Sequence, residues 1–284
     1  MPTKIIETPR DAMQGISAFI PTQKKIDYIN TLLEVGFAEV DFSSFVSPRA
    51  IPQLRDSAEV IEQLNWQKSS SRIMATIGSL RGGQRALEHK AIGSVAFPFS
   101  ISEVFLEKNI RSDFIKGTQS IQDLLQLCNV KERELVLYIA MAFGNPYGDE
   151  WSLEILYDWT LRLQKMGVKT LVLADTTGDG SCRGIADSFQ MLIKEFPMME
   201  IGVHLHTTPD DWHDKVAAAY ENGCRRFDTA LGGFGGCPMS GKKLIGNLPT
   251  ENLIEYLQKQ GEELEIEQEV FNAARTMAAF TFPH

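Results

Sequence analysis

A chain of 284 residues, 43% hydrophobic and 23% charged, has the composition of an ordinary globular protein and is long enough for one large α/β domain or two smaller ones. Its net charge of −9 argues against a general nucleic-acid binder, and no apolar run approaches the ~20 residues that span a bilayer. No signal or transit pattern opens the sequence and the four cysteines form no C-x-x-C pair. We therefore expect a cytoplasmic protein with free thiols and with neither nucleic-acid nor membrane partners.

Short β-branched or apolar runs recur along the chain and predict strands, with amphipathic stretches at helical spacing between them. The predicted strands cover residues 4–8, 37–44, 72–78, 94–100, 134–142, 170–176, 200–207 and 226–232. Clear examples of the predicted helices lie at residues 22–34 and 151–166, and the glycines at 36, 167 and 223 mark helix ends. A final helix is predicted over residues 262–280.

The alternation of strand and helix predicts a parallel sheet. Eight such units in roughly 250 residues match a (β/α)₈ TIM barrel, here a single domain over residues 1–284 with the final helix packed on it. A doubly wound open sheet is the alternative fold, but the Gly-rich fingerprint expected after its first strand is missing from this chain.

The Val-His-Leu-His stretch at residues 203–206 closes the seventh predicted strand. Alternation puts His204 and His206 on one face, about 7 Å apart, where two imidazoles can bind one divalent metal. The pattern fits equally well two half-buried strand histidines bonded to their neighbours, and the spacing alone does not decide between these readings.

Polar residues collect where the predicted strands end, and in a TIM barrel these ends form the catalytic rim. Asp11 follows the first strand, the two histidines end the seventh, and Asn247 comes after the eighth. Together these residues would supply four ligands to a divalent cation and leave two positions open for a chelating substrate. We therefore expect a catalytic metal site.

Six motifs in chain order resemble hydroxymethylglutaryl-CoA lyase, a family of metal-dependent TIM-barrel lyases. They are Thr-Pro-Arg-Asp-Ala-Met-Gln (8–14), Ser-Phe-Val-Ser-Pro-Arg (44–49), Ala-Asp-Thr-Thr-Gly (174–178), Val-His-Leu-His (203–206), Gly-Gly-Cys-Pro (235–238) and Gly-Asn-Leu-Pro-Thr-Glu (246–251). The resemblance implies that Mg²⁺ or Mn²⁺ is bound by Asp11, His204, His206 and Asn247.

The resemblance also implies a retro-Claisen cleavage of a 3-hydroxyacyl-CoA, most simply 3-hydroxy-3-methylglutaryl-CoA, to acetyl-CoA and acetoacetate. It makes Arg10 a catalytic cation and Cys237 the acid on a mobile loop. It makes Gln14 a group that contacts the substrate, and we expect Asp175 and Thr176, at the end of the sixth strand, to do the same. The class of fold suggests a homodimer.

Asp41, a further predicted catalytic residue, stands where these lyases usually have Glu, which retracts the carboxylate by roughly 1.5 Å. The loop between Cys237 and Asn247 is one residue longer than in the family and different in composition. Both changes surround the substrate and leave the predicted metal ligands unchanged. An aldolase or Claisen-type synthase acting on 2-oxoacids, and a barrel that binds metal and acyl-CoA without turnover, are the alternatives.

Overall fold

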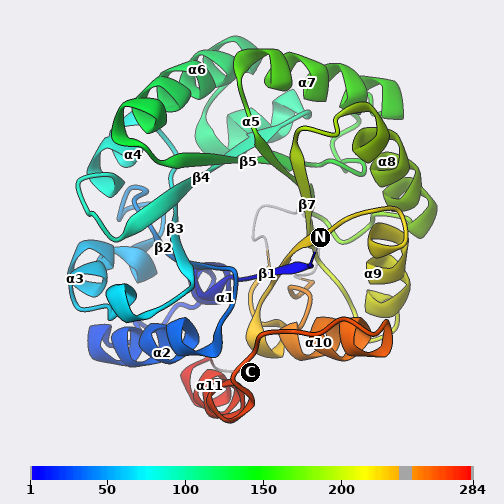
Figure 1. Cartoon of the computed structure of the whole chain (residues 1–284). Coiled ribbons are helices and arrows are strands. Elements are labelled where there is room, and N and C mark those ends of the chain that lie inside the picture. Colours follow the sequence, from blue (N-terminus) through cyan, green and yellow to red (C-terminus); the bar gives the residue numbers. More distant parts are fainter. Residues whose placement is uncertain (1, 237–244, 283–284) are drawn as a thin grey trace.

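Eight parallel strands hydrogen-bond in chain order and close into a barrel, β1 pairing with both β2 and β8 (Figure 1). In this computed structural model, residues 2–236 and 245–282 are described. The closed ring of eight parallel strands confirms the predicted (β/α)₈ barrel. The strands are β1 (Lys4–Glu7), β2 (Glu39–Ser44), β3 (Arg72–Thr76), β4 (Ile92–Ser100), β5 (Glu134–Ala140), β6 (Thr170–Asp175), β7 (Glu200–Leu205) and β8 (Arg226–Thr229).

Helices surround the barrel, most of them in one ring, as Figure 1 shows. They are α1 (Pro9–Gln14), α2 (Thr22–Val35), α3 (Ser57–Glu62), α4 (Leu80–Ala86), α5 (Glu103–Ile110), α6 (Phe114–Lys131), α7 (Leu153–Met166), α8 (Cys182–Glu195), α9 (Trp212–Tyr220), α10 (Thr250–Lys259) and α11 (Gln268–Thr281), with short 3₁₀ turns η1 (Pro52–Leu54), η2 (Trp66–Lys68) and η3 (Leu231–Gly233). Within the described parts of the chain, none of these helices combines the length and apolarity needed to cross a membrane.

Local sequence sets several helix boundaries as predicted. The Ser152 side chain accepts a hydrogen bond from the Ile155 amide at the start of α7, because a helix leaves its first amides without backbone partners. Gly36 and Gly167 end α2 and α7 in the left-handed conformation that glycine adopts without strain.

The predicted final helix begins six residues later than expected, at Gln268 rather than residue 262. Leu264 and Ile266 pack on the core at the spacing of an extended segment, not of a helix. Glu262 accepts hydrogen bonds from Thr3 and from the Tyr220 hydroxyl, which hold its chain on the barrel. α11 then packs against α2, outside the helix ring (Figure 1).

Side chains fill the barrel in layers, because alternate residues of each strand point inward. An apolar layer in the middle of the barrel contains Ile6, Met74, Ala96, Val136 and Val172. Toward the amino-terminal ends of the strands the filling becomes ionic. There Arg226 of β8 donates to Glu39 of β2 at 2.8 Å, with both side chains buried.

We predict that Glu39→Gln destabilises the fold by about 3 kcal/mol, since it removes the nearer charged partner of the buried Arg226 and leaves the more distant Glu200, at 3.5 Å. Chemical denaturation would measure the change. Glu255→Gln is the matched control, because it removes a carboxylate from an exposed pair with Lys259 and should leave the unfolding midpoint unchanged. Equal effects of the two substitutions would contradict the prediction.

Candidate metal centre and active site

Asp11, His204 and His206 converge at the carboxyl-terminal rim of the barrel. His204 points inward from β7, His206 follows the end of that strand, and Asp11 lies in α1 directly after β1. The two Nε2 atoms are 3.3 Å apart, and Asp11 Oδ2 is 3.8 Å from His204 Nε2. One ligand atom from each of the three residues fits within 4.8 Å of the others, and all three residues are buried.

Asn247 reaches the same place because its segment pairs with the end of β7. The Thr207 amide donates to the Gly246 carbonyl, and the Leu248 amide donates to the Leu205 carbonyl. Asn247 donates its own Nδ2 to the Phe234 carbonyl at 2.7 Å. This bond turns Asn247 Oδ1 the other way, where it is buried and accepts no hydrogen bond within the described structure.

The four predicted ligands suit a divalent cation. Two buried oxygens, Asp11 Oδ2 and Asn247 Oδ1, have no hydrogen-bond partner among the residues described. Leaving such atoms unsatisfied is costly, and an ion is one explanation for them. Two imidazole nitrogens face the same point, so the donor set is mixed oxygen and nitrogen, which divalent metals accept.

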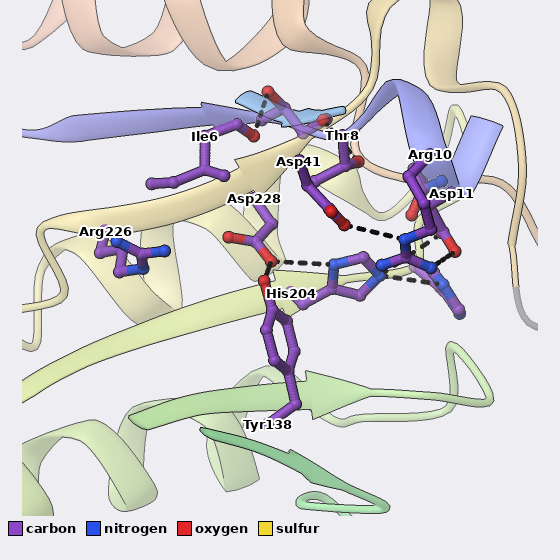
Figure 2. Close-up of polar contacts among 12 residues, drawn as sticks. Ile6, Thr8, Arg10, Asp11, Asp41, Tyr138, His204, Arg226 and Asp228 are labelled. Atoms are coloured by element: carbon purple, nitrogen blue, oxygen red, sulfur yellow. Dashed lines mark hydrogen bonds and ion pairs between the residues drawn. The ribbon is translucent and has the colours of Figure 1, made fainter. Parts of the chain in front are cut away.

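Partners behind the two rings fix their orientation. Asp228 Oδ2 lies 3.2 Å from His204 Nδ1 and also accepts from the Tyr138 hydroxyl at 2.6 Å, as Figure 2 shows. His206 Nδ1 lies 3.0 Å from the Thr176 carbonyl. Each ring therefore donates from Nδ1 and keeps Nε2 as a free ligand atom.

Sequence reasoning missed Asp228 and Tyr138. The sequence does contain a signal, because strand alternation puts Asp228 and Arg226 on the same face of β8. Alternation does not show, however, which residue of another strand lies opposite Asp228.

The electrostatics favour the metal-binding protonation states of His206 and Asp11. For His204, burial opposes the charged ring, but the hydrogen bond to Asp228 and the nearby Asp11 raise its pKa above the ordinary value. Burial, followed by the neighbouring His204, lowers the pKa of His206 to about 4, so its ring is neutral at pH 7. Burial alone would raise the pKa of Asp11, but Arg10 and the two imidazoles lower it below its ordinary value. Asp11 is therefore ionised.

Arg10 joins the ligand cluster to two other predicted residues. Its Nε donates to Asp41 Oδ2 and its Nη1 to Asp11 Oδ1, both at 2.8 Å, and Nη1 also donates to Gln14 Oε1 at 3.2 Å. Figure 2 shows the guanidinium between the two carboxylates. Burial opposes the charge of Arg10, but Asp41 and Asp11 raise its pKa above the ordinary value.

Asp41 is buried and bonded to Arg10 and to the Thr76 hydroxyl. Burial raises the pKa of Asp41 to about 6, against the opposing effect of Arg10. The structure therefore brings Arg10, Gln14 and Asp41 together beside the ligand cluster.

Two predicted substrate contacts lie elsewhere. Asp175 points outward from β6, where Lys215 of α9 pairs with one oxygen at 2.9 Å and the Gly180 amide donates to the other. Its strand register explains this, since Ala174 and not Asp175 is paired with the inward-facing His204. Thr176 supports the site from behind, through its carbonyl to His206 and its hydroxyl to the Met141 amide. A direct substrate contact is thus unsupported for Asp175, and Cys237 lies outside the described residues.

A family model described as HMGL-like matches residues 3–278. The chain belongs to this family. It is 31% identical to the cytoplasmic 3-hydroxy-3-methylglutaryl-CoA lyase of Mus musculus, over 91% of this chain and 75% of that protein. It is 30% identical to the hydroxymethylglutaryl-CoA lyase YngG of Bacillus subtilis, over 88% of this chain and 83% of the relative.

Solved structures of the family have the same fold. An HMG-CoA lyase from Acinetobacter baumannii, in complex with coenzyme A and 3-methylmalate, superposes with a TM-score of 0.90 at 29% identity and covers 100% of this chain and 93% of its own. The HMG-CoA lyase of Bacillus subtilis gives a TM-score of 0.89 at 27% identity, over 97% and 93% of the two chains.

We predict that Gly235→Ala weakens binding of a divalent cation at least tenfold. A Cβ at this position would lie 2.5 Å from the Asp11 carbonyl and 2.7 Å from Asn247 Nδ2, so two ligand residues would have to move apart. Titration calorimetry with Mn²⁺ would measure the affinity.

Gly261→Ala is the control for Gly235→Ala. Gly261 has a similar positive φ, but its added Cβ meets nothing within 4 Å, so this variant carries the backbone strain without the clash. The same Mn²⁺ affinity in both variants would mean that Gly235 does not hold the ligands together.

Proposed function

We propose that the protein is a divalent-metal-dependent carbon–carbon lyase that cleaves 3-hydroxy-3-methylglutaryl-CoA to acetyl-CoA and acetoacetate. One observation carries the proposal: two orphaned buried oxygens and two oriented imidazoles meet at the catalytic rim of a barrel from the HMGL-like family. The relatives named above are HMG-CoA lyases, and they match this chain over 91% and 88% of its length. This similarity supports the proposed substrate.

In the proposal, Asp11, His204, His206 and Asn247 bind Mg²⁺ or Mn²⁺. Anionic and amide oxygens favour these hard cations, and the imidazoles are compatible with Mn²⁺ in particular. When bound, the cation acts as a Lewis acid that makes a substrate hydroxyl easier to deprotonate.

We propose that Arg10 stabilises the negative charge that develops in the transition state. The 3-hydroxyl proton passes to a base, for which we propose the Asp41 carboxylate beside Arg10. Cleavage of the C2–C3 bond then gives acetoacetate and a thioester enolate, so negative charge develops on the thioester oxygen. A buried, permanently charged guanidinium stabilises such a charge better than one in water. Asp41 and Gln14 hold the guanidinium in place through their hydrogen bonds to it.

A proton must reach C2 of the enolate to complete acetyl-CoA. We propose Cys237 as its donor, on the basis of the Gly-Gly-Cys-Pro motif. The glycines before it, Gly235 and Gly236, have positive φ, a backbone conformation that glycine adopts without strain.

We also propose a cytoplasmic location and a homodimer. The names of some relatives place them in the cytoplasm and those of others in mitochondria. The free thiols of Cys128, Cys182 and Cys224 fit a reducing compartment. Analytical ultracentrifugation would test the dimer.

Removal of metal should abolish cleavage. After EDTA treatment and gel filtration we expect no acetyl-CoA release from 3-hydroxy-3-methylglutaryl-CoA, with activity restored by Mg²⁺ or Mn²⁺ in a coupled assay. A 2-oxoacid turned over under the same conditions, with the CoA ester inert, would favour the synthase or aldolase alternative.

If cleavage were unchanged in both Asp11→Asn and Cys237→Ala, neither residue would have its proposed role.

Arg10→Lys should lower kcat by about 10²–10³ with a much smaller change in KM. A lysine keeps the charge, but it cannot donate to Asp41, Asp11 and the substrate in one plane. Steady-state kinetics at saturating metal would separate the two constants. Arg275→Lys, on the outer helix α11, is the control, and similar kcat values in the two variants would rule out the role given to Arg10.

A further inference from the structure

A single buried carboxylate ties together the two ends of the connection between β8 and α10. Glu7, on the outward face of β1, accepts from the Leu231 amide at 2.9 Å through one oxygen. Its other oxygen accepts from the Thr250 hydroxyl at 2.6 Å. Leu231 directly follows the β8 region and Thr250 begins α10, so Glu7 clamps both described ends of the segment that carries Asn247.

The clamped ends determine where Asn247 lies. The Ala230 amide donates to the Leu248 carbonyl, and the Thr250 amide donates back to the Ala230 carbonyl. Between these points, Asn247 Nδ2 donates to the Phe234 carbonyl, which turns Oδ1 away from that carbonyl. A shift of Leu231 or Thr250 would therefore be passed to the Asn247 amide through backbone bonds.

Glu7 also belongs to the strand that leads into Asp11. Its backbone lies opposite Thr229 of β8, and the next residue, Thr8, donates to the Thr229 carbonyl from both its amide and its hydroxyl. Asp11 follows in the first turn of α1. One side chain thus links the segment that presents Asp11 to the segment that presents Asn247.

The Glu7 side chain lies in the protein interior, where its bonds to Leu231 and Thr250 are shielded from water. Glu7 is fully buried and interacts electrostatically with Glu251 and Tyr28, and burial raises the pKa of Glu7 to about 8. A neutral carboxylic acid can still accept from Leu231 and donate to Thr250. An amide of the same shape can do so too, which makes glutamine the conservative variant.

We infer that Glu7 is a positioning residue, which holds Asn247 at the separation from Asp11 that metal binding needs, without itself contacting metal or substrate. This inference rests on the proposed metal site. Such supporting partners usually change metal affinity by 10–100-fold when they are removed.

The test is the affinity for Mn²⁺ alone, measured by electron paramagnetic resonance of the free ion. We expect Glu7→Gln to stay within about threefold of the parent protein, and Glu7→Met, which has similar length but makes neither bond, to bind at least tenfold more weakly. Thr250→Val removes one of the two bonds with little change of shape and should give a smaller loss.

A double-mutant cycle distinguishes positioning from general destabilisation. If Glu7 acts through Asn247, then Glu7→Met should cause no further loss in an Asn247→Ala background. Thr160→Val is the structural control, because it removes a buried hydroxyl that bonds only within α7 and should lower stability without changing Mn²⁺ affinity.

The outcomes separate the two ideas. A parent protein that binds no Mn²⁺ would overturn the proposed metal site, and the inference with it. A parent that binds Mn²⁺ while Glu7→Met binds it equally well would overturn the role of Glu7 alone. An equal loss in the presence and absence of the Asn247 side chain would do the same. Should Glu7→Met not fold, Thr250→Val in the same cycle decides the question.

Discussion

Pairing of β1 with β8 closes the barrel, and the arrangement of the site depends on that closure. Residues 4–7 lie in register with residues 226–229, and Thr8 continues the contact to Thr229. This register places Asp11 beside His204 and His206, more than 190 positions later in the chain. In an open sheet β1 and β8 would be edge strands, and Asp11 would have no reason to lie near either histidine.

A packed barrel interior makes the site rigid, because inward side chains from neighbouring strands cannot move independently. The charges inside it are arranged along the barrel. Arg226 pairs with Glu39 toward the amino-terminal ends of the strands, while Asp228, two residues on, pairs with Tyr138 and His204 nearer the rim (Figure 2). The ionic filling that stabilises the barrel therefore continues into the partners that orient a metal ligand.

The orphaned oxygens of Asp11 and Asn247 cost stability, because no described residue pairs with them, and they fit the proposed metal site. Both residues are buried, and the other polar atom of each side chain is hydrogen-bonded, Asp11 Oδ1 to Arg10 and Asn247 Nδ2 to the Phe234 carbonyl. A site held this way is preorganised, since its ligands need little movement to accept an ion. Arg10 donates to the Asp11 carboxylate, so the proposed metal site and the proposed catalytic cation are coupled through one side chain.

The sequence by itself determined most of the elements and brought two candidate metal ligands onto one face of a strand. Strand–helix alternation predicted the barrel, glycines at 36 and 167 marked helix ends, and the His204–His206 spacing put two imidazoles on one face, because these features depend only on local periodicity and backbone freedom. Tertiary structure alone decided the partners. It turned Asp175 outward to Lys215, placed Asp228 behind His204, and drew the chain around Glu262 out of a helix. Each of these outcomes depends on register between strands or on a partner far away in the chain, and no local pattern specifies which distant residue will lie opposite.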